Sequence, residues 1–237
     1  MPLPLELVAL AALIMGLGAM LQAAVGFGGA LIWVPLLALI DTALVPGPTL
    51  MASLALAGAM AYRERGAIQT GQLAVALIGL AVGTVAAAAA LTVIARGQLP
   101  TVFATLILAG VVLSVAGLRP AVSRASLVVG GIAAGIMGTM AGLHGPPIAL
   151  VYQSEAGERV RATLGAFFIV CYATALFALN RVGLFGAPEA LLGAALMPGV
   201  IAGYAASRLL SAELDGRRLR LAILVVSAGS ALALLFK

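Results

Sequence analysis

The chain has 237 residues, of which 63% are hydrophobic and only 9% are charged. Soluble domains carry about 25% charged residues, so this composition excludes an ordinary soluble domain. It indicates an all-α polytopic membrane protein, because a run of about 20 apolar residues can cross a bilayer as a helix. The formal net charge is +5, but the cations lie singly or in small groups at the ends of apolar runs. We therefore interpret them as topology signals and expect no nucleic-acid partner.

The start of the chain and the single cysteine add two smaller points. Secretory signal peptides begin with a positive region, whereas the first cation here is Arg63, so we expect the N-terminal apolar run to be retained. The lone Cys171 cannot form an internal disulfide and says nothing about the redox compartment.

Hydropathy divides the chain into apolar runs that fall into two halves. The runs cover roughly residues 5–40, 48–62, 71–95, 99–118, 126–153, 160–180, 188–210 and 218–236. We expect a first repeat over 1–122 and a second over 123–237, within one compact membrane domain. The halves match weakly but in order: Gly26 corresponds to Gly142, Ser53-Leu54 to Thr163-Leu164, Tyr62 to Tyr172, and Gly83 to Gly203. Internal duplication is typical of transporters; the alternative is that small residues recur on the packing faces of any helical bundle.

The cations distinguish two crossing patterns. If every run spans once, six cations lie on one side and seven on the other. If the first run of each half enters and returns as a hairpin, each half crosses three times and the second half is inverted. Ten cations then face three: Arg63, Arg65, Arg119, Arg124, Arg159, Arg161, Arg208, Arg217, Arg218 and Arg220 against Arg96, Arg181 and Lys237. The positive-inside rule favours this second pattern, and it predicts that both termini face the periplasm.

Residues 22–37, QAAVGFGGALIWVPLL, are apolar enough for the bilayer but hold Gly26, Gly28 and Gly29. Because glycine weakens a helix and opened backbone in hydrocarbon needs new partners, we interpret GFGG as the turn of a re-entrant or broken hairpin. Its counterpart is GLHGPP, residues 142–147. After Pro147 about eight apolar residues precede Glu155, a reach of roughly 12 Å, so this return arm cannot span. The first arm, from Leu5 to Val25, is long enough to cross, so we expect asymmetric hairpins.

The two turns predict an anion site. Inverted halves would bring them together near the membrane midplane, where each return arm points a helix N-terminus at the centre. Free N–H groups and the helix dipole favour an anion there, glycine permits close approach, and Pro146-Pro147 suits a helix start. No Asp, Glu, Lys or Arg lies deep in an apolar run. The candidate substrate-binding residues are Gln22, Gly26, Phe27, Gly28, Gly29, Gly142, His144, Gly145, Pro146, Gln153 and Arg161.

Several of these residues admit two interpretations. His144 could donate to an anion or take up a proton with it, because its unperturbed pKa is about 6.5; alternatively it is a neutral imidazole bonded to a carbonyl. Gln22 and Gln153 could bind the ligand or satisfy opened backbone. Arg161, in the first turn of a helix, needs an anionic partner such as Glu158 or the substrate, or it simply sets topology. The aromatic residues Trp33, Tyr62, Tyr152 and Tyr172 are interpreted as interface anchors or packing groups.

The motif GFGGALIWVPLLAL, and GLHGPPIALVYQ followed by ERVRATLGAFF, resemble the sulfite-exporter-like (TauE/SafE) family of membrane permeases. The resemblance covers almost the whole chain, although Ala30 and His144 stand where the family often has glycine. It implies transport of a small sulfur-containing or organic oxyanion, such as sulfite or a sulfonate, across the bacterial inner membrane.

Three function classes follow from these observations. The first is a secondary transporter or facilitator of a small anion, with proton coupling and a homo-oligomer both left open. The second is a non-transporting membrane partner or assembly factor. The third is a membrane-embedded enzyme with His144 as a base, which is disfavoured because no deep carboxylate or cysteine accompanies that histidine. We expect no cofactor or metal.

Overall fold

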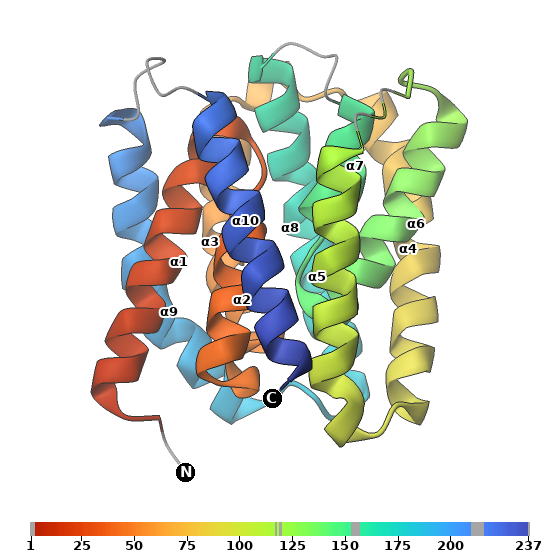
Figure 1. Cartoon of the computed structure of the whole chain (residues 1–237). Helices are drawn as coiled ribbons and strands as arrows, with labels where there is room; N and C mark the ends of the chain where they lie inside the picture. The colour runs from red at the N-terminus through yellow and green to blue at the C-terminus, as the bar shows by residue number, and fades with distance from the viewer. Residues whose placement is uncertain (1–2, 117, 119, 153–156, 210–215, 237) are drawn as a thin grey trace.

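The computed structural model describes residues 3–116, 118, 120–152, 157–209 and 216–236, and within these ranges the chain is helical and contains no strand (Figure 1). The all-α class predicted from the composition is therefore confirmed. The α-helices are α1 (Leu5–Val25), α2 (Ala30–Ile40), α3 (Gly47–Arg63), α4 (Thr70–Val93), α5 (Leu99–Val115), α6 (Arg124–Ala141), α7 (Gly145–Tyr152), α8 (Gly157–Arg181), α9 (Ala187–Ala206) and α10 (Gly216–Leu235). Short 3-10 helices are η1 (Thr42–Leu44), η2 (Arg65–Ala67), η3 (Arg96–Gln98) and η4 (Ser207–Leu209).

Both predicted turns break a helix. The α1 helix ends at Gly26 with φ of 105°, and α6 ends at Gly142 with φ of 77°. These left-handed conformations are accessible to glycine at little cost, which explains why glycine occupies both helix ends. The chain then returns along α2, of 11 residues, and α7, of 8 residues. The short second return arm agrees with the length expected from the sequence.

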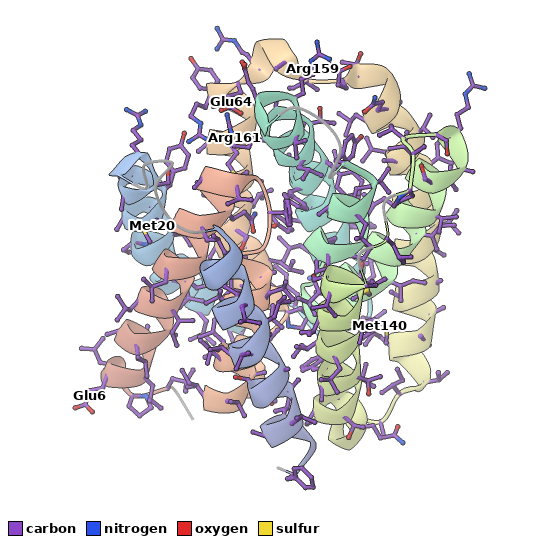
Figure 2. All side chains as sticks on the ribbon, turned by 45° about the horizontal axis from the view of Figure 1, so that its top comes forward. Glu6, Met20, Glu64, Met140, Arg159 and Arg161 are labelled. Atoms are coloured by element: carbon purple, nitrogen blue, oxygen red, sulfur yellow. The ribbon has the colours of Figure 1, made fainter. Side chains whose placement is uncertain are left out.

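Figure 1 shows that the connectors gather at two ends of the bundle. The α3–α4 connector and η4 lie at the top, and so do the starts of α6 and α8; the α2–α3, α4–α5 and α8–α9 connectors lie at the bottom, beside both chain ends. Helix α1 therefore runs upward and α6 downward. Glu64, Arg159 and Arg161 lie at the top, and Glu6 lies at the opposite end (Figure 2).

The elements that carry most of the cations meet at one end of the bundle. Arg63, Arg65, Arg124, Arg159, Arg161 and Arg208 belong to elements that meet at the top, which we call the cation-rich end, and α10 begins there with Arg217, Arg218 and Arg220. The opposite end holds η3, with Arg96, and the end of α8, with Arg181. Arg119 and Lys237 lie outside the described residues.

The sequence suggested that hairpin arms and spanning helices would differ in length. The observed helix lengths do not separate these two classes. By length and hydropathy the six described helices able to cross a bilayer are α1, α3 with η1, α4, α6, α8 and α9. The first hairpin arms α1 and α6 are thus long, as expected for α1, whereas α5 has only 17 residues. At 1.5 Å per residue, about 17 residues is the lower limit for crossing the roughly 30 Å hydrocarbon layer.

Two helix pairs approach closely through glycine. On α4, a side chain at Gly79 or Gly83 would overlap backbone of α6. On α9, a side chain at Gly199 or Gly203 would overlap backbone of α1. Small residues allow this close contact, which supplies the dispersion energy that holds helices together in lipid. Gly83 and Gly203, matched in the sequence, therefore both serve packing.

We predict that the connectors around residues 66 and 97 face opposite sides of the membrane. Gly66→Cys and Gly97→Cys form a matched pair, because a side chain at either position would meet no other atom within 4 Å. In a Cys171→Ala background, a membrane-impermeant maleimide should label one position in intact cells and the other only in inverted vesicles. Labelling of both from the same side would contradict this arrangement.

Candidate functional site

The two glycine turns meet inside the bundle. A side-chain carbon placed on Gly145 would lie 3.9 Å from the Gly28 nitrogen and 3.9 Å from the Phe27 Cβ. Gly28 lies two residues before the start of α2 at Ala30, and Gly145 is the first residue of α7. The start of α7 therefore lies beside the first turn. Because Pro146 and Pro147 carry no N–H, Gly145 supplies the first backbone donor of α7.

His144 lies beside this meeting point and is only 1% exposed. Neither Nδ1 nor Nε2 has a hydrogen-bond partner among the described residues. The ring packs edge-on against Tyr172, with ring centroids 5.3 Å apart, and Gly138 lies directly against its other side. A buried polar group without a hydrogen-bond partner costs free energy. The alternative of a neutral imidazole bonded to a carbonyl is not seen among the described residues.

Tyr172 joins the two hairpins. The buried Gln22 side chain, one turn before GFGG, donates from Nε2 to the Tyr172 hydroxyl at 3.3 Å. The Tyr172 ring also stacks on Phe168, with centroids 5.6 Å apart, and the Phe168 ring lies against Gly145. Gln22, Tyr172 and His144 thus form one buried polar group of side chains beside the turns.

Helix α3 contributes two further hydroxyl groups. Thr49 donates from Oγ1 to the Pro46 carbonyl at 2.7 Å and lies near Gly142. Ser53, one turn later on the same face of α3, is buried, and its Oγ has no hydrogen-bond partner in the described part of the chain. Unpaired hydroxyl and imidazole groups on neighbouring elements can bind a polar ligand.

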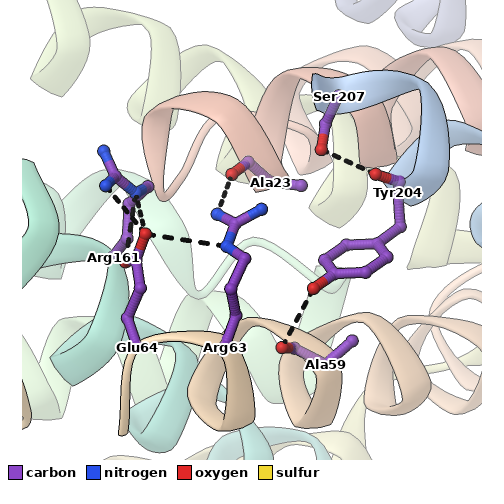
Figure 3. Close-up of polar contacts among 7 residues, drawn as sticks. All are labelled: Ala23, Ala59, Arg63, Glu64, Arg161, Tyr204 and Ser207. Carbon is purple, nitrogen blue, oxygen red and sulfur yellow. Dashed lines mark hydrogen bonds and ion pairs between the residues drawn. The ribbon is translucent and has the colours of Figure 1, made fainter. Parts of the chain in front are cut away.

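A second polar group of side chains lies on the cation-rich side of the first turn (Figure 3). Arg161 donates from Nε and Nη2 to the Glu64 carboxylate, at 2.8 to 3.1 Å, and its Cγ packs against Gly26. The sequence offered Glu158 as a partner, but the described partner of Arg161 is Glu64 at the end of α3, and the Glu158 side chain is exposed. Arg63 donates to the Ala23 carbonyl at 2.7 Å, which favourably places a cation at the C-terminus of α1.

A cavity of about 300 Å³ opens from the opposite end of the bundle. Its lining includes Thr42, Pro46, Gly47, Phe103 and Glu189, from connectors and helix ends at the bottom of Figure 1, and Met140, from the end of α6 inside the bundle. Pro46 also lies against Gly142, so the cavity reaches the outer end of the second turn. No group of three His, Cys, Asp or Glu side chains among the described residues could hold a metal ion.

The family model for the sulfite exporter TauE/SafE matches residues 10–234. The chain belongs to this family. Membership in the TauE/SafE family indicates a membrane transporter of sulfur-containing anions rather than an enzyme, and it agrees with the resemblance found in the sequence. No curated protein and no solved structure matched the chain.

The structure separates the candidate residues into groups. Gln22, Phe27, Gly28, His144 and Gly145 lie around the meeting point of the turns. Gly26 with Arg161, and Gly142, lie at the outer ends of the two turns, on opposite sides. Gly29 packs against Gly18 and Trp33, and Pro146 lies near Gly110, so both have evident packing roles. Gln153 lies outside the described residues.

Sequence reasoning missed Tyr172, Ser53 and Glu64 as site residues. Tyr172 was matched with Tyr62 and interpreted as an interface anchor or a packing group; Tyr62 is 72% exposed, whereas Tyr172 is buried and stacks on Phe168, as a packing group would. One sequence feature could have identified Tyr172: a tyrosine in the middle of an apolar run needs a hydrogen-bond partner for its hydroxyl. No local pattern indicates the pairing of Glu64 with Arg161, which are 97 residues apart.

We predict that Gly138→Ala destabilises the protein by about 1–3 kcal/mol, because the added methyl group would overlap the His144 ring in a packed interior. The matched control is Gly58→Ala on α3, where a side chain would meet nothing within 4 Å. Thermal unfolding of the purified proteins in detergent measures the difference. Equal midpoints for the two variants would show that His144 does not pack against α6 in this way.

Proposed function

We propose that this chain is a secondary transporter or facilitator of a small oxyanion, such as sulfite or a sulfonate, across the bacterial inner membrane. In this proposal the anion binds near the midplane, between the N-termini of α2 and α7. The observation that carries it is the approach of Gly28 to Gly145 beside a buried His144 whose ring nitrogens lack partners in the described chain. A small oxyanion would accept hydrogen bonds from these groups.

The proposed site stabilises negative charge without a buried cation. A dehydrated anion needs several donors, and two opposed helix N-termini offer backbone N–H groups and favourable dipoles. Gln22 and Tyr172 add neutral polar groups nearby. Because Gly28 and Gly145 have no side chains, the backbone can approach the ligand closely. Neutral donors bind an anion weakly enough to release it, as transport requires.

The proposal includes two inverted repeats, 1–122 and 123–237, with both termini in the periplasm. Support comes from reciprocal packing: α1 contacts α9 as α6 contacts α4, and α3 contacts α9 as α8 contacts α4. Helices α1 and α6 also run in opposite directions (Figure 1). The cation-rich end would face the cytoplasm by the positive-inside rule. Rocking of one half against the other would then expose the site alternately to the two sides.

His144 offers a route to proton coupling. Protonating a fully buried imidazole alone is costly, because burial disfavours its charged form. An anion bound between the turns would supply the missing negative charge, so proton and anion would bind together. The pair would cross as a neutral unit, which lowers the cost of moving charge through the membrane interior.

Two other classes remain as alternatives. A non-transporting assembly factor would need the glycine turns only for packing, and Gly29 shows that packing accounts for part of the motif. A membrane-embedded enzyme would need a nucleophile or metal set beside His144, whereas Tyr172, Gln22 and Phe168 are the groups near it. Transport of a labelled anion by the purified protein separates these classes.

We predict that the purified protein in proteoliposomes takes up radiolabelled sulfite or a short alkyl sulfonate, and that Gly28→Val abolishes most of this uptake. Gly28 has φ of 99°, which a β-branched residue rarely adopts, and a side chain there would obstruct the backbone donors. Leu21 is its nearest neighbour at 3.6 Å, so a small side chain meets no backbone. Gly58→Val is the control. Normal uptake by Gly28→Val would make the turn a packing feature only.

We predict that uptake by the parent varies with pH and that His144→Gln loses most of this dependence while keeping some binding. Glutamine preserves a hydrogen-bond donor but cannot take up a proton. Rates from about pH 5.5 to 8 bracket the unperturbed histidine value. If both proteins give parallel profiles, His144 supplies only an ordinary hydrogen bond, worth about 0.5–1.5 kcal/mol, and the helix N-termini alone form the site.

A further inference from the structure

The Glu64 carboxylate occupies a position well suited to an oxyanion. It lies directly after α3 and accepts three hydrogen bonds from Arg161 on α8. Arg63 approaches the same carboxylate, with Nε 3.6 Å from Oε1. Two guanidinium groups therefore face one carboxylate, whose side chain is only 13% exposed (Figure 3).

This position adjoins the first turn. The Arg161 Cγ would lie 3.1 Å from a side-chain carbon on Gly26, and the Arg161 backbone lies against the same glycine. From Gly26 the chain passes through Phe27 to Gly28, which borders Gly145. A ligand leaving the proposed midplane site toward the cation-rich end would meet Arg161 next to this turn.

Arg63 and Arg161 make different contacts. Arg63 binds the Ala23 carbonyl and so satisfies an open acceptor at the end of α1, and its guanidinium also lies 5.6 Å from the centre of the Tyr204 ring. Arg161 makes its described hydrogen bonds with Glu64, through Nε and Nη2. Its guanidinium could therefore change partner without opening the end of α1.

We propose that Arg161 forms a second oxyanion-binding position at the cation-rich mouth of the first turn, and that Glu64 occupies this position when substrate is absent. This inference rests on the proposed transport function. A guanidinium binds the paired oxygens of a carboxylate, and those of a sulfite or sulfonate, in the same fork geometry. Substrate entering from this end competes with the tethered Glu64 carboxylate for Arg161.

The exchange also changes how the cation-rich end is closed. The Arg161–Glu64 pair links α8 to the end of α3. When an anion replaces Glu64, that link is lost. Helix α8 stays joined to α3 at Gly165, which packs on the Ala61 backbone, and to the α3–α4 connector through the Gln69 N–H, which donates to Thr163 Oγ1 at 3.0 Å. The exchange therefore loosens the cation-rich end locally and leaves the two helices packed together.

The test measures uptake of labelled sulfite into inverted vesicles at varied concentration, with the cation-rich end outside as established by labelling at position 66. Glu64→Gln removes the competing charge and keeps the shape, so the half-saturating concentration should fall about threefold to tenfold, as expected for a partly exposed ion pair. Arg161→Gln should raise it. Adding Glu64→Gln to Arg161→Gln should then change nothing further, because the competition requires Arg161.

Two controls make the outcome decisive. Arg159→Gln removes an exposed cation two residues away on the same helix and should leave half-saturation unchanged. Glu64→Asp shortens the side chain by one methylene and should lower the half-saturating sulfite concentration less than Glu64→Gln does. This variant replaces Glu64→Gln in the test if Glu64→Gln does not fold. If the pair is only structural, Glu64→Gln lowers the unfolding midpoint without lowering half-saturation, and the inference is wrong. If the parent takes up neither sulfite nor an alkyl sulfonate, the proposed function fails as well.

Discussion

The arrangement of this protein depends on one constraint: backbone and side-chain polar groups inside an apolar bundle must find partners. Both hairpins open their helices in the interior, where water cannot satisfy the freed N–H groups. The bundle encloses these openings between two closely packed helix pairs, α1 with α9 and α4 with α6, whose glycines let backbones touch. Within the described part of the chain, the buried His144 imidazole has no hydrogen-bond partner. A polar ligand is the natural partner for such a group.

The placement of charge follows from the same constraint. Arginine and glutamate stay near the end of the bundle, where Arg161, Glu64 and Arg63 neutralise one another and the end of α1. The interior keeps neutral donors, namely the turns, His144, Gln22 and Tyr172. An anion moving between these regions would exchange a strong charged partner for several weak neutral ones. Neither position needs to bind it tightly, which suits transport better than storage.

The sequence predicted the helix breaks well because they have local causes. Glycines in an apolar run and a double proline indicate a broken helix wherever they occur, and α1 and α6 indeed end at Gly26 and Gly142. The brevity of α7 followed from simple counting of residues. Helix lengths were predicted less well: α5, with 17 residues, is a marginal span, whereas the hairpin arms α1 and α6 are long. Apolar composition says that a segment tolerates lipid, but neighbouring helices decide how much of it is helical.

By itself the sequence determined the membrane class, the two turns and the end of the bundle where cations gather, because these depend on composition, local conformational preference and the order of apolar runs. The family came from the resemblance of its glycine and proline motifs to known members. Only the tertiary structure decided which polar groups meet. Gln22 with Tyr172, Arg161 with Glu64, and Gly138 with His144 are set by how separate helices dock. Docking depends on side-chain volume and backbone distance summed over many contacts, and no single motif encodes that sum.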